Sequence, residues 1–346
     1  MSTQETTPAA AVDTSIPNGD VASAHAVNGD STPKEPLNPA PFDKLPYKLD
    51  PNWKPEPGHV GNLTPEQEKA LEELKEEIKK EGAWVEERMD DATVLRFLRA
   101  RKWNVANAKT MFLSAEQWRK DFGVEELMNN FDFKEKEEVD KYYPQFYHKT
   151  DKQGRPIYIE RLGFLDIKAL NACTTTQRQL QRLVYEYEIF LRHRLPAASA
   201  AVGHPVETSC TILDLAGVSL SNFVKVRDYV NQATQIGQER YPEVMGKFYI
   251  VNAPWVFSTV WSVIKGWLDP VTIAKVKILG SGEKEWVVLR EEIGVGAEEV
   301  LPASLGVGGR CRCVEYKEKE EGERKDGWCL GSDAGPWNPP KVKVQA

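Results

Sequence analysis

The sequence contains few residues with the types and spacing that catalysis requires. A G-x-S-x-G nucleophile elbow is absent, and the nearest segment, GVSLS at 217–221, lacks the second glycine. Cys311 and Cys313 form a C-x-C pair without a fourth ligand at metal spacing, which favours free thiols. The histidines form neither H-x-x-x-H nor H-E-x-x-H pairs, and they are His25, His59, His148, His193 and His204. We therefore expect no catalytic residues, no metal site and no enzymatic activity.

The segment ILGSGEKEW at 278–286 partly matches a dinucleotide-binding turn. Gly280 and Gly282 lie between a predicted strand and a predicted helix, but the third glycine of that fingerprint is missing. Glu283 and Glu285 would stand where a pyrophosphate binds, and their charge would repel it. An acidic helix start is the favoured interpretation, and a nucleotide-dependent oxidoreductase is the alternative.

A basic cluster, RFLRARK, lies near the end of another predicted helix. It contains Arg96, Arg99, Arg101 and Lys102. Positive charge is stabilised by the dipole at a helix C-terminus, which explains the cluster without any ligand. A phosphate-binding edge is the functional alternative, and the residues alone leave both open.

The segment from Asn252 to Pro270, NAPWVFSTVWSVIKGWLDP, has an unusually wide apolar face for an acidic chain. On a helical wheel eight apolar residues fall within an arc of about 160°, where core packing needs about 100°. They are Val256, Phe257, Val260, Trp261, Val263, Ile264, Trp267 and Leu268, with Gly266 on the opposite arc. The segment is either an ordinary core helix or a lid over an apolar cavity that swings toward a membrane.

Composition limits the classes that remain. The chain has 346 residues, of which 41% are hydrophobic and 10% aromatic, so a sizeable core is available. The net charge of −7 argues against nucleic acid as the main partner. Five cysteines without scaffold spacing suit free thiols in a reducing compartment. The start, MSTQETTPAA, has no basic or apolar signal region, and no segment is long enough to span a bilayer, so we expect a soluble, cytosolic protein.

Three helices are predicted after a tail at residues 1–58 that is expected to be disordered. The first begins at a capping box on Thr64 and runs to Gly82. The second, TVLRFLRARKW, is expected to be capped by Asp91, and the third, which ends at Gly123, by Asn104. These helices predict a small all-α domain at 59–125.

Strands and helices then alternate, which predicts a mostly parallel α/β sheet at 126–310, followed by a partly disordered tail at 311–346. If the segment at 252–270 is a lid, one face of the sheet could form the floor of a cavity. The predicted strands are 156–163, 207–217, 247–254 and 274–280, and the predicted helices are 175–195, 221–241, 252–270 and 283–294.

Several long blocks together resemble the CRAL-TRIO lipid-binding family, and within it the yeast-type phosphatidylinositol/phosphatidylcholine transfer proteins of the secretory pathway. The resemblance runs from Thr64 to Leu301, with an isolated SDAGPW at 332–337. It implies a helical N-terminal domain and an α/β domain whose sheet floors a hydrophobic lipid pocket, with the segment at 252–270 as its gate. The blocks are RFLRARKW, YPQFYHKTDKQGRPIYIE, GHPVETSCTILDLAG, YPEVMGKFYIVNAP and LDPVTIAKVKILG.

The resemblance also implies two headgroup sites. For phosphatidylinositol it points to Arg101, Glu243, Thr272 and Lys275. For phosphatidylcholine it points to Tyr147, Tyr158, Ser209 and Thr211. For the gate it points to Trp255, Phe257, Val260, Trp261, Ile264 and Trp267.

The residue types suit these roles. A buried phosphodiester needs cations or hydrogen-bond donors, and tyrosine rings attract a quaternary ammonium. The structural alternatives are a simple salt bridge between Glu243 and Lys275, and ordinary strand hydroxyls at Ser209 and Thr211.

Two segments depart from the family pattern. Val244 stands where related sequences often carry arginine, so one contact to the inositol phosphate is expected to be missing. In LPASLGVGGRC, Leu305 replaces an aromatic residue, and Gly306 and Val307 look like an insertion before Gly308 and Gly309. Local packing there is expected to differ from the family.

The implied function is exchange of phosphatidylinositol and phosphatidylcholine between membranes, with no cofactor besides the bound phospholipid. The resemblance further implies presentation of phosphatidylinositol to a phosphatidylinositol 4-kinase in support of Golgi secretory traffic, by a cytoplasmic monomer that visits Golgi and endosomal membranes. One alternative is a carrier of another hydrophobe, such as a sterol, an isoprenoid or haem. A scaffold that binds no lipid is a further alternative.

Overall fold

The computed structural model describes Phe42 and residues 45–218, 220–294, 296–302, 305, 329 and 331–338, with the backbone alone for 220–224. All of them belong to the compact unit Asn38–Ala346. Of the tail expected to be disordered at 1–58, residues 1–41, 43 and 44 lie outside the described residues. The same is true of the expected insertion at Gly306 and Val307 and of Cys311 and Cys313.

The N-terminal helices are α1 (Pro65–Lys80), α2 (Asp91–Ala100) and α3 (Val105–Phe122). Thr64 forms the predicted capping box, and Asn104 caps α3 through the backbone N–H of Asn107. The prediction for α2 was wrong by one residue, because Asp90 supplies the cap and Asp91 lies in the first turn. These helices share a core whose fully buried members include Leu74, Ile78, Leu95, Leu98 and Phe112.

Further helices, both long and short, connect the N-terminal helices to the sheet and lie around the sheet. The predicted helices at 175–195 and 221–241 are α7 (Thr176–Ile189) and α9 (Leu220–Arg240), and a π-helical turn (Phe190–Arg194) extends α7. Short helices of four to eight residues escaped prediction, because so few turns carry little hydrophobic periodicity. They are α4 (Val124–Asn130), α5 (Lys136–Tyr142), α6 (Ile167–Cys173), α8 (Leu195–Val202), α11 (Pro270–Ala274) and α13 (Ala297–Val300).

The sheet confirms the predicted mostly parallel α/β architecture. Its strand order is β5-β4-β3-β2-β1-β6, and among the described strands only the β1–β2 pair is antiparallel. The bounds are β1 (Gln145–Thr150), β2 (Pro156–Arg161), β3 (Ser209–Asp214), β4 (Met245–Val251), β5 (Val276–Ile278) and β6 (Asp333–Ala334). Strands β1 and β6 were not predicted, and β6 reaches the sheet from far along the chain.

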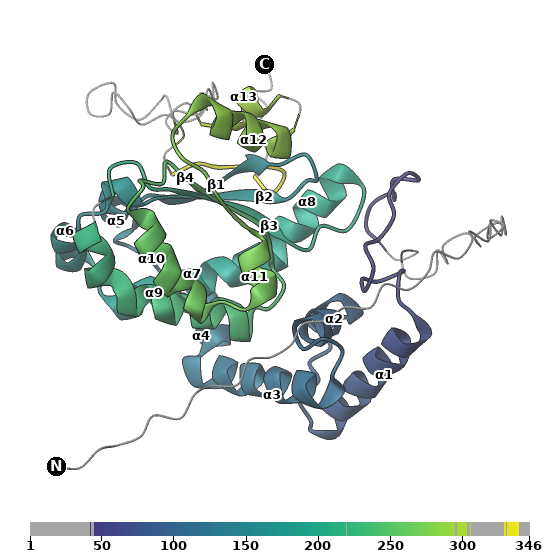
Figure 1. The fold of residues 1–346 in the computed structure, drawn as a ribbon. Coiled ribbons are helices and arrows are strands. Elements are labelled where there is room, and N and C mark those ends of the chain that lie inside the picture. Colours follow the sequence, from purple (N-terminus) through teal and green to yellow (C-terminus); the bar gives the residue numbers. More distant parts are fainter. Residues whose placement is uncertain are drawn as a thin grey trace, which may run out of the picture. The chain divides into compact units, whose positions relative to one another are not determined.

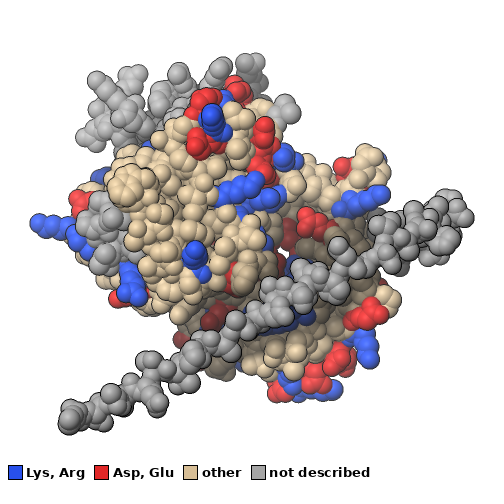
Figure 2. All heavy atoms as spheres, in the orientation of Figure 1, with Lys and Arg blue, Asp and Glu red and all other residues tan. Residues whose placement is uncertain are grey.

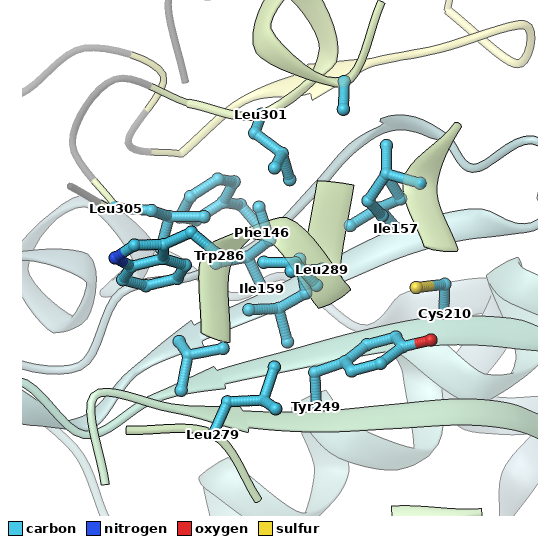
Figure 3. Packing of buried hydrophobic residues seen from close by; sticks show 14 residues of the cluster. Phe146, Ile157, Ile159, Cys210, Tyr249, Leu279, Trp286, Leu289, Leu301 and Leu305 are labelled. Carbon is cyan, nitrogen blue, oxygen red and sulfur yellow. The ribbon is translucent and has the colours of Figure 1, made fainter. Parts of the chain in front are cut away.

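The two faces of the sheet have different neighbours. Helices α12 (Glu283–Ile293) and α13 lie over one face, and α7, α9, α10 (Phe257–Ile264) and α11 lie on the other side (Figure 1). On the first face, side chains of β1 to β4 pack against Trp286, Leu289 and Ile293 of α12 (Figure 3). The strand residues of this core include Phe146, Ile157, Ile159, Cys210, Ile212 and Tyr249.

None of the helices within the described ranges is both long and apolar enough to cross a bilayer.

We predict that Leu289→Ala strongly destabilises the fold, because Leu289 is fully buried between α12 and the sheet. The free energy of unfolding should fall by about 2–5 kcal/mol, as for other buried leucines. The matched control is Val287→Ala on the same helix, where the side chain is 43% exposed, and its effect should stay within about 0.5 kcal/mol. Urea denaturation measures both, and equal losses would contradict the assignment of the α12 core face.

Candidate functional site

A cavity of about 1000 Å³ lies on the sheet face that α12 does not cover. This volume is at the upper end for ligand pockets, and most of the wall is apolar. Its walls come from helices α7, α9, α10 and α11, its floor from the strands, and part of its rim from the end of α2. Apolar members of the wall include Leu183, Val230, Phe248, Ile250, Val260 and Ile264.

The floor follows the register of the strands. Tyr147 pairs with Tyr158, which pairs with Thr211, which pairs with Phe248 of β4. Residues paired across neighbouring strands point to the same face, so these side chains form one row across the cavity floor. All four line the cavity.

The structure brings together the four residues expected for phosphatidylcholine. The hydroxyl oxygens of Ser209 and Thr211 are 3.5 Å apart, and the rings of Tyr147 and Tyr158 have centroids 4.9 Å apart. Burial raises the pKa of both tyrosines above its ordinary value, so their hydroxyls stay protonated and can donate hydrogen bonds. The group therefore combines hydroxyl donors with aromatic rings.

The four residues expected for phosphatidylinositol also line the cavity, and they come from more distant elements. Lys275 Nζ lies 3.3 Å from Glu243 Oε2, so the salt bridge considered from the sequence is present. Thr272 donates its hydroxyl to the carboxylate of Asp269, which also caps α11. Arg101 follows the last residue of α2, and its guanidinium donates to the carbonyl of Ala100 at 3.2 Å.

Left-handed backbone occurs at the rim of the cavity. Lys102, Trp103 and Glu243 have φ values of 51°, 65° and 59°, which non-glycine residues adopt at some energetic cost. Lys102 and Trp103 turn the chain directly after Arg101, and Glu243 opens the turn into β4. Such strain persists only where the surrounding structure holds it, so the backbone around Arg101 and Glu243 is firmly set.

The basic cluster at 96–102 divides between structural contacts and the cavity rim, and a phosphate-binding role stays a prediction. Arg99 donates to the carbonyl of Gly58 at 3.0 Å and to Glu207 at 3.1 Å, which are structural contacts. Arg101 and Lys102 line the cavity rim, where a phosphate could reach them.

Residues of the segment at 252–270 line the wall of the cavity, and the role of this segment as a gate stays a prediction. Most of its apolar arc lines the wall, with Phe257 and Val260 only 7% exposed. Trp255 differs, because it precedes α10, points away from the lining and is 89% exposed. The other residues expected for the gate, Trp261, Ile264 and Trp267, line the wall.

The wheel was wrong at two positions of this segment. Val263 is 40% exposed and does not line the cavity, whereas Gly266 does. The α-helix ends at Ile264 and continues as a 3₁₀ turn over Lys265–Trp267. A 3₁₀ turn has fewer residues per turn than an α-helix, so the phase of the apolar face changes at Gly266, whereas Val263 lies before the turn and is not explained by it.

Val244 and Leu305, the departures from the family pattern, are both buried, at 6% and 2% exposure. Val244 lies on the cavity wall next to Glu243, one of the residues expected to bind a headgroup, and its apolar side chain offers no hydrogen bond or charge to a phosphate.

The sequence analysis missed several polar residues of the cavity, among them Glu160. It lies two positions after Tyr158 on β2, and its carboxylate accepts a hydrogen bond from Tyr143 at 3.3 Å. Deep burial raises the pKa of this carboxyl above its ordinary value, and the hydroxyls of Tyr158 and Tyr143 only partly oppose the shift. The alternation of side chains along β2 was a sufficient signal for Glu160, because residues two positions apart on a strand, such as Tyr158 and Glu160, point to the same face.

The alternative of a dinucleotide site finds little support in the turn at 280–282. Helix α12 begins at Glu283 with Glu283 and Glu285 in its first turn, as the acidic interpretation predicts. A Cβ added at Gly282 would lie 2.5 Å from the Glu285 carboxylate, so a carboxylate fills the space beside the turn. Over the described ranges, no group of three or more His, Cys, Asp or Glu side chains could hold a metal ion.

Comparison with known proteins finds two matching family models and several similar proteins. A family model described as the CRAL/TRIO domain matches residues 140–308, and one described as the CRAL/TRIO N-terminal domain matches residues 68–114. The Sec14 cytosolic factor of Schizosaccharomyces pombe is 49% identical over 281 residues, covering 81% of this chain and 91% of that protein.

This chain matches only about half the length of two further relatives. The SEC14 cytosolic factor of Yarrowia lipolytica is 56% identical over 228 residues, covering 66% of this chain and 46% of that protein. The phosphatidylinositol/phosphatidylcholine transfer protein SFH12 of Arabidopsis thaliana is 38% identical over 278 residues, covering 80% of this chain and 48% of that protein.

We predict that Glu160 makes stability depend on pH. Its pKa is raised in the folded chain, so above the ordinary value of 4.5 the unfolded chain releases this proton first. Rising pH should therefore lower the free energy of unfolding of the parent protein relative to Glu160→Gln, which has no proton to lose. Urea denaturation of both proteins at several pH values between about 4.5 and 7 tests this. A difference that stays constant with pH would show that the carboxyl has an ordinary pKa.

Proposed function

The chain belongs to the CRAL-TRIO family, and we propose that it is a phospholipid transfer protein that exchanges phosphatidylinositol and phosphatidylcholine between membranes. The observation that carries this proposal is one apolar cavity with two separate groups of polar residues on its wall. The name of the Arabidopsis relative supports the choice of these two lipids.

The apolar wall suits the acyl chains. Each CH₂ group removed from water contributes about 0.8 kcal/mol, so about 30 such groups make release into water unfavourable by roughly 24 kcal/mol. A carrier with this cavity therefore releases its lipid only into a membrane or another apolar site. Exchange at a bilayer surface needs no covalent step.

We assign the phosphatidylinositol headgroup to the rim of the cavity. Lys275 and Arg101 would neutralise the phosphodiester, and Glu243 and Thr272 would bond the inositol hydroxyls. The ion pair between Lys275 and Glu243 supports this, because each group can exchange its partner for part of the ligand. A buried phosphate without such cations would be strongly unfavourable.

We assign the phosphatidylcholine headgroup to the sheet floor. Ser209 and Thr211 would donate to the phosphate, while the rings of Tyr147 and Tyr158 would attract the quaternary ammonium. Glu160 lies beside Tyr158, and an ammonium group nearby would favour its charged form. This division keeps the two headgroups on different elements of one cavity.

The gate is proposed to meet the membrane through exposed apolar side chains around the cavity. Figure 2 shows a broad, largely uncharged area over α10, in the orientation of Figure 1. Exposed apolar residues of this part of the chain include Trp255, Val263 of α10 and Val271 of α11. Tryptophan favours the membrane interface, because its ring is apolar and its N–H is polar.

The wider role we propose rests on the family resemblance. The protein would work from the cytosol as a monomer, visit Golgi and endosomal membranes and support secretory traffic there. It would present phosphatidylinositol to a phosphatidylinositol 4-kinase.

The lipids extracted from the purified protein test this function by mass spectrometry. The parent protein should carry phosphatidylcholine and phosphatidylinositol, together at about one molecule per protein, as a single cavity of this size allows. Lys275→Ala should lower the phosphatidylinositol share by about tenfold or more and leave phosphatidylcholine loading unchanged, because a buried phosphate loses its cation.

The matched control is Lys277→Ala. Lys277 pairs with Glu292 of α12 on the other side of the sheet, and its loss should leave both lipids at parental levels. Equal loss of both lipids in Lys275→Ala would contradict the headgroup assignment, and a parent protein without phospholipid would contradict the function.

We predict that Trp255→Ala weakens binding to vesicles without changing which lipids are bound. Truncating an exposed interfacial ring should reduce vesicle association by about tenfold, since its apolar area no longer enters the bilayer. Co-sedimentation with phosphatidylcholine vesicles measures this. Val287→Ala is the control, because Val287 is exposed on α12, beyond the opposite face of the sheet. A similar loss in both variants would argue against the gate as the membrane contact.

A further inference from the structure

The C-terminal segment Ser332–Trp337 extends the row of residues on the cavity floor. Its strand β6 pairs in parallel with β1, and Asp333 pairs with Tyr147. The row Thr211, Tyr158 and Tyr147 therefore continues to Asp333 at the sheet edge. The side chain of Asp333 lies on the cavity side of the sheet but does not line the cavity.

Asp333 holds a buried arginine over the ring of Tyr147. Arg194 ends the π-helical turn after α7, is 7% exposed, and has its guanidinium carbon 4.0 Å from the centre of the Tyr147 ring. It donates to Asp333 Oδ1 at 3.2 Å and to Glu186 Oε2 at 3.0 Å. Two carboxylates therefore balance the charge of this arginine.

Trp337 completes the contact from the same segment. Its Nε1–H donates both to the carbonyl oxygen of Asp333 at 3.1 Å and to its Oδ1 at 3.0 Å. The indole ring meets the ring of Tyr147 edge-on, at 6.1 Å and 78°. A Cβ at Gly335 would lie 2.3 Å from the indole, so only glycine allows this approach.

The segment is anchored at its start as well. The hydroxyl of Ser332 lies 2.9 Å from Nδ1 of His148 and accepts from the backbone N–H of Ala334 at 3.1 Å. Ser332 is 2% exposed and His148 is fully buried. The contacts of Asp333 and Trp337 thus come from a segment fixed at the sheet edge.

We propose that Arg194, Asp333 and Trp337 are positioning residues for phosphatidylcholine, which they affect through Tyr147. None of the three lines the cavity, so each acts through the tyrosine. This inference rests on the proposed function, in which Tyr147 faces the choline group.

The physical reason lies in the charge of Arg194. A guanidinium already covers one part of the Tyr147 ring, so a second cation must approach the ring elsewhere. Without Asp333, this arginine would be less neutralised and would repel the ammonium group. The same change leaves phosphatidylinositol unaffected, because Lys275 and Glu243 belong to other elements.

Asp333→Asn in the full chain tests the proposal. The asparagine keeps an oxygen that can accept from Trp337 and removes the charge that pairs with Arg194. After incubation with vesicles of equimolar phosphatidylcholine and phosphatidylinositol, extracted lipids are measured. The ratio of phosphatidylcholine to phosphatidylinositol should fall about fivefold, the size expected for one partly exposed ion pair. Phosphatidylinositol transfer and the unfolding midpoint should stay at parental values.

Asp333→Glu and Glu283→Gln are the controls. Asp333→Glu retains the carboxylate and should restore most of the phosphatidylcholine, whereas Glu283→Gln removes an exposed, paired carboxylate on α12 and should change nothing. If Asp333→Asn proves unstable, Trp337→Phe removes the N–H donor and should shift the ratio in the same direction.

The outcomes separate this inference from the function beneath it. If the parent protein loads both lipids and the folded variants keep its ratio of phosphatidylcholine to phosphatidylinositol, the positioning role alone is overturned. Parallel loss of both lipids also overturns it, because that result indicates a merely structural effect. A parent that loads neither lipid overturns the proposed function, and the positioning role with it.

Discussion

Successive side chains of a strand point to opposite faces, and the two faces of this sheet have different neighbours. On β2, Ile157 and Ile159 pack under α12, while Tyr158 and Glu160 face the cavity. A slip of one residue in the pairing would exchange these sets, burying a carboxyl under α12 and placing isoleucines where polar groups now stand. The α12 core therefore determines more than stability. It sets the register that brings Thr211, Tyr158 and Tyr147 into one row on the cavity floor.

Polar groups in an apolar cavity are unfavourable unless they have partners, and here many pair with one another. Lys275 pairs with Glu243, Thr272 with Asp269, and Ser209 with Thr211. Under the proposed function, a headgroup that enters such a site would replace one hydrogen-bond partner with another. The difference in free energy between partners is smaller than the cost of leaving a buried group without any. A protein that must bind two different headgroups in turn benefits from this arrangement, because neither exchange passes through an unpaired buried charge.

The sequence was sufficient for the long elements, and most of the residues that its family resemblance names line one cavity. Thr64 and Asn104 mark helix starts through local hydrogen bonds, and such local signals are readable without the fold. Glu160 could also have been predicted, because it lies two residues after Tyr158 on the same strand and therefore points to the same face. The contact between Arg194 and Asp333 could not be predicted, because the two residues are 139 positions apart and meet only once β6 joins the sheet. The wheel failed at Gly266 because it assumed one helical period past the point where a 3₁₀ turn begins. Domain boundaries and headgroup roles stay predictions.

Charge balance links the two proposed headgroup sites. Each has a cation in or behind its lining, and each cation is paired with carboxylates, Glu243 for Lys275 and Asp333 with Glu186 for Arg194. An unbalanced cation at the sheet floor would favour anionic lipids in general and would repel the ammonium of a zwitterionic one. Excess negative charge at the rim would exclude the phosphodiester of an inositol lipid. A cavity that accepts both headgroups therefore needs its charges paired locally, and carboxylates supplied by separate elements allow each pair to be tuned without disturbing the other.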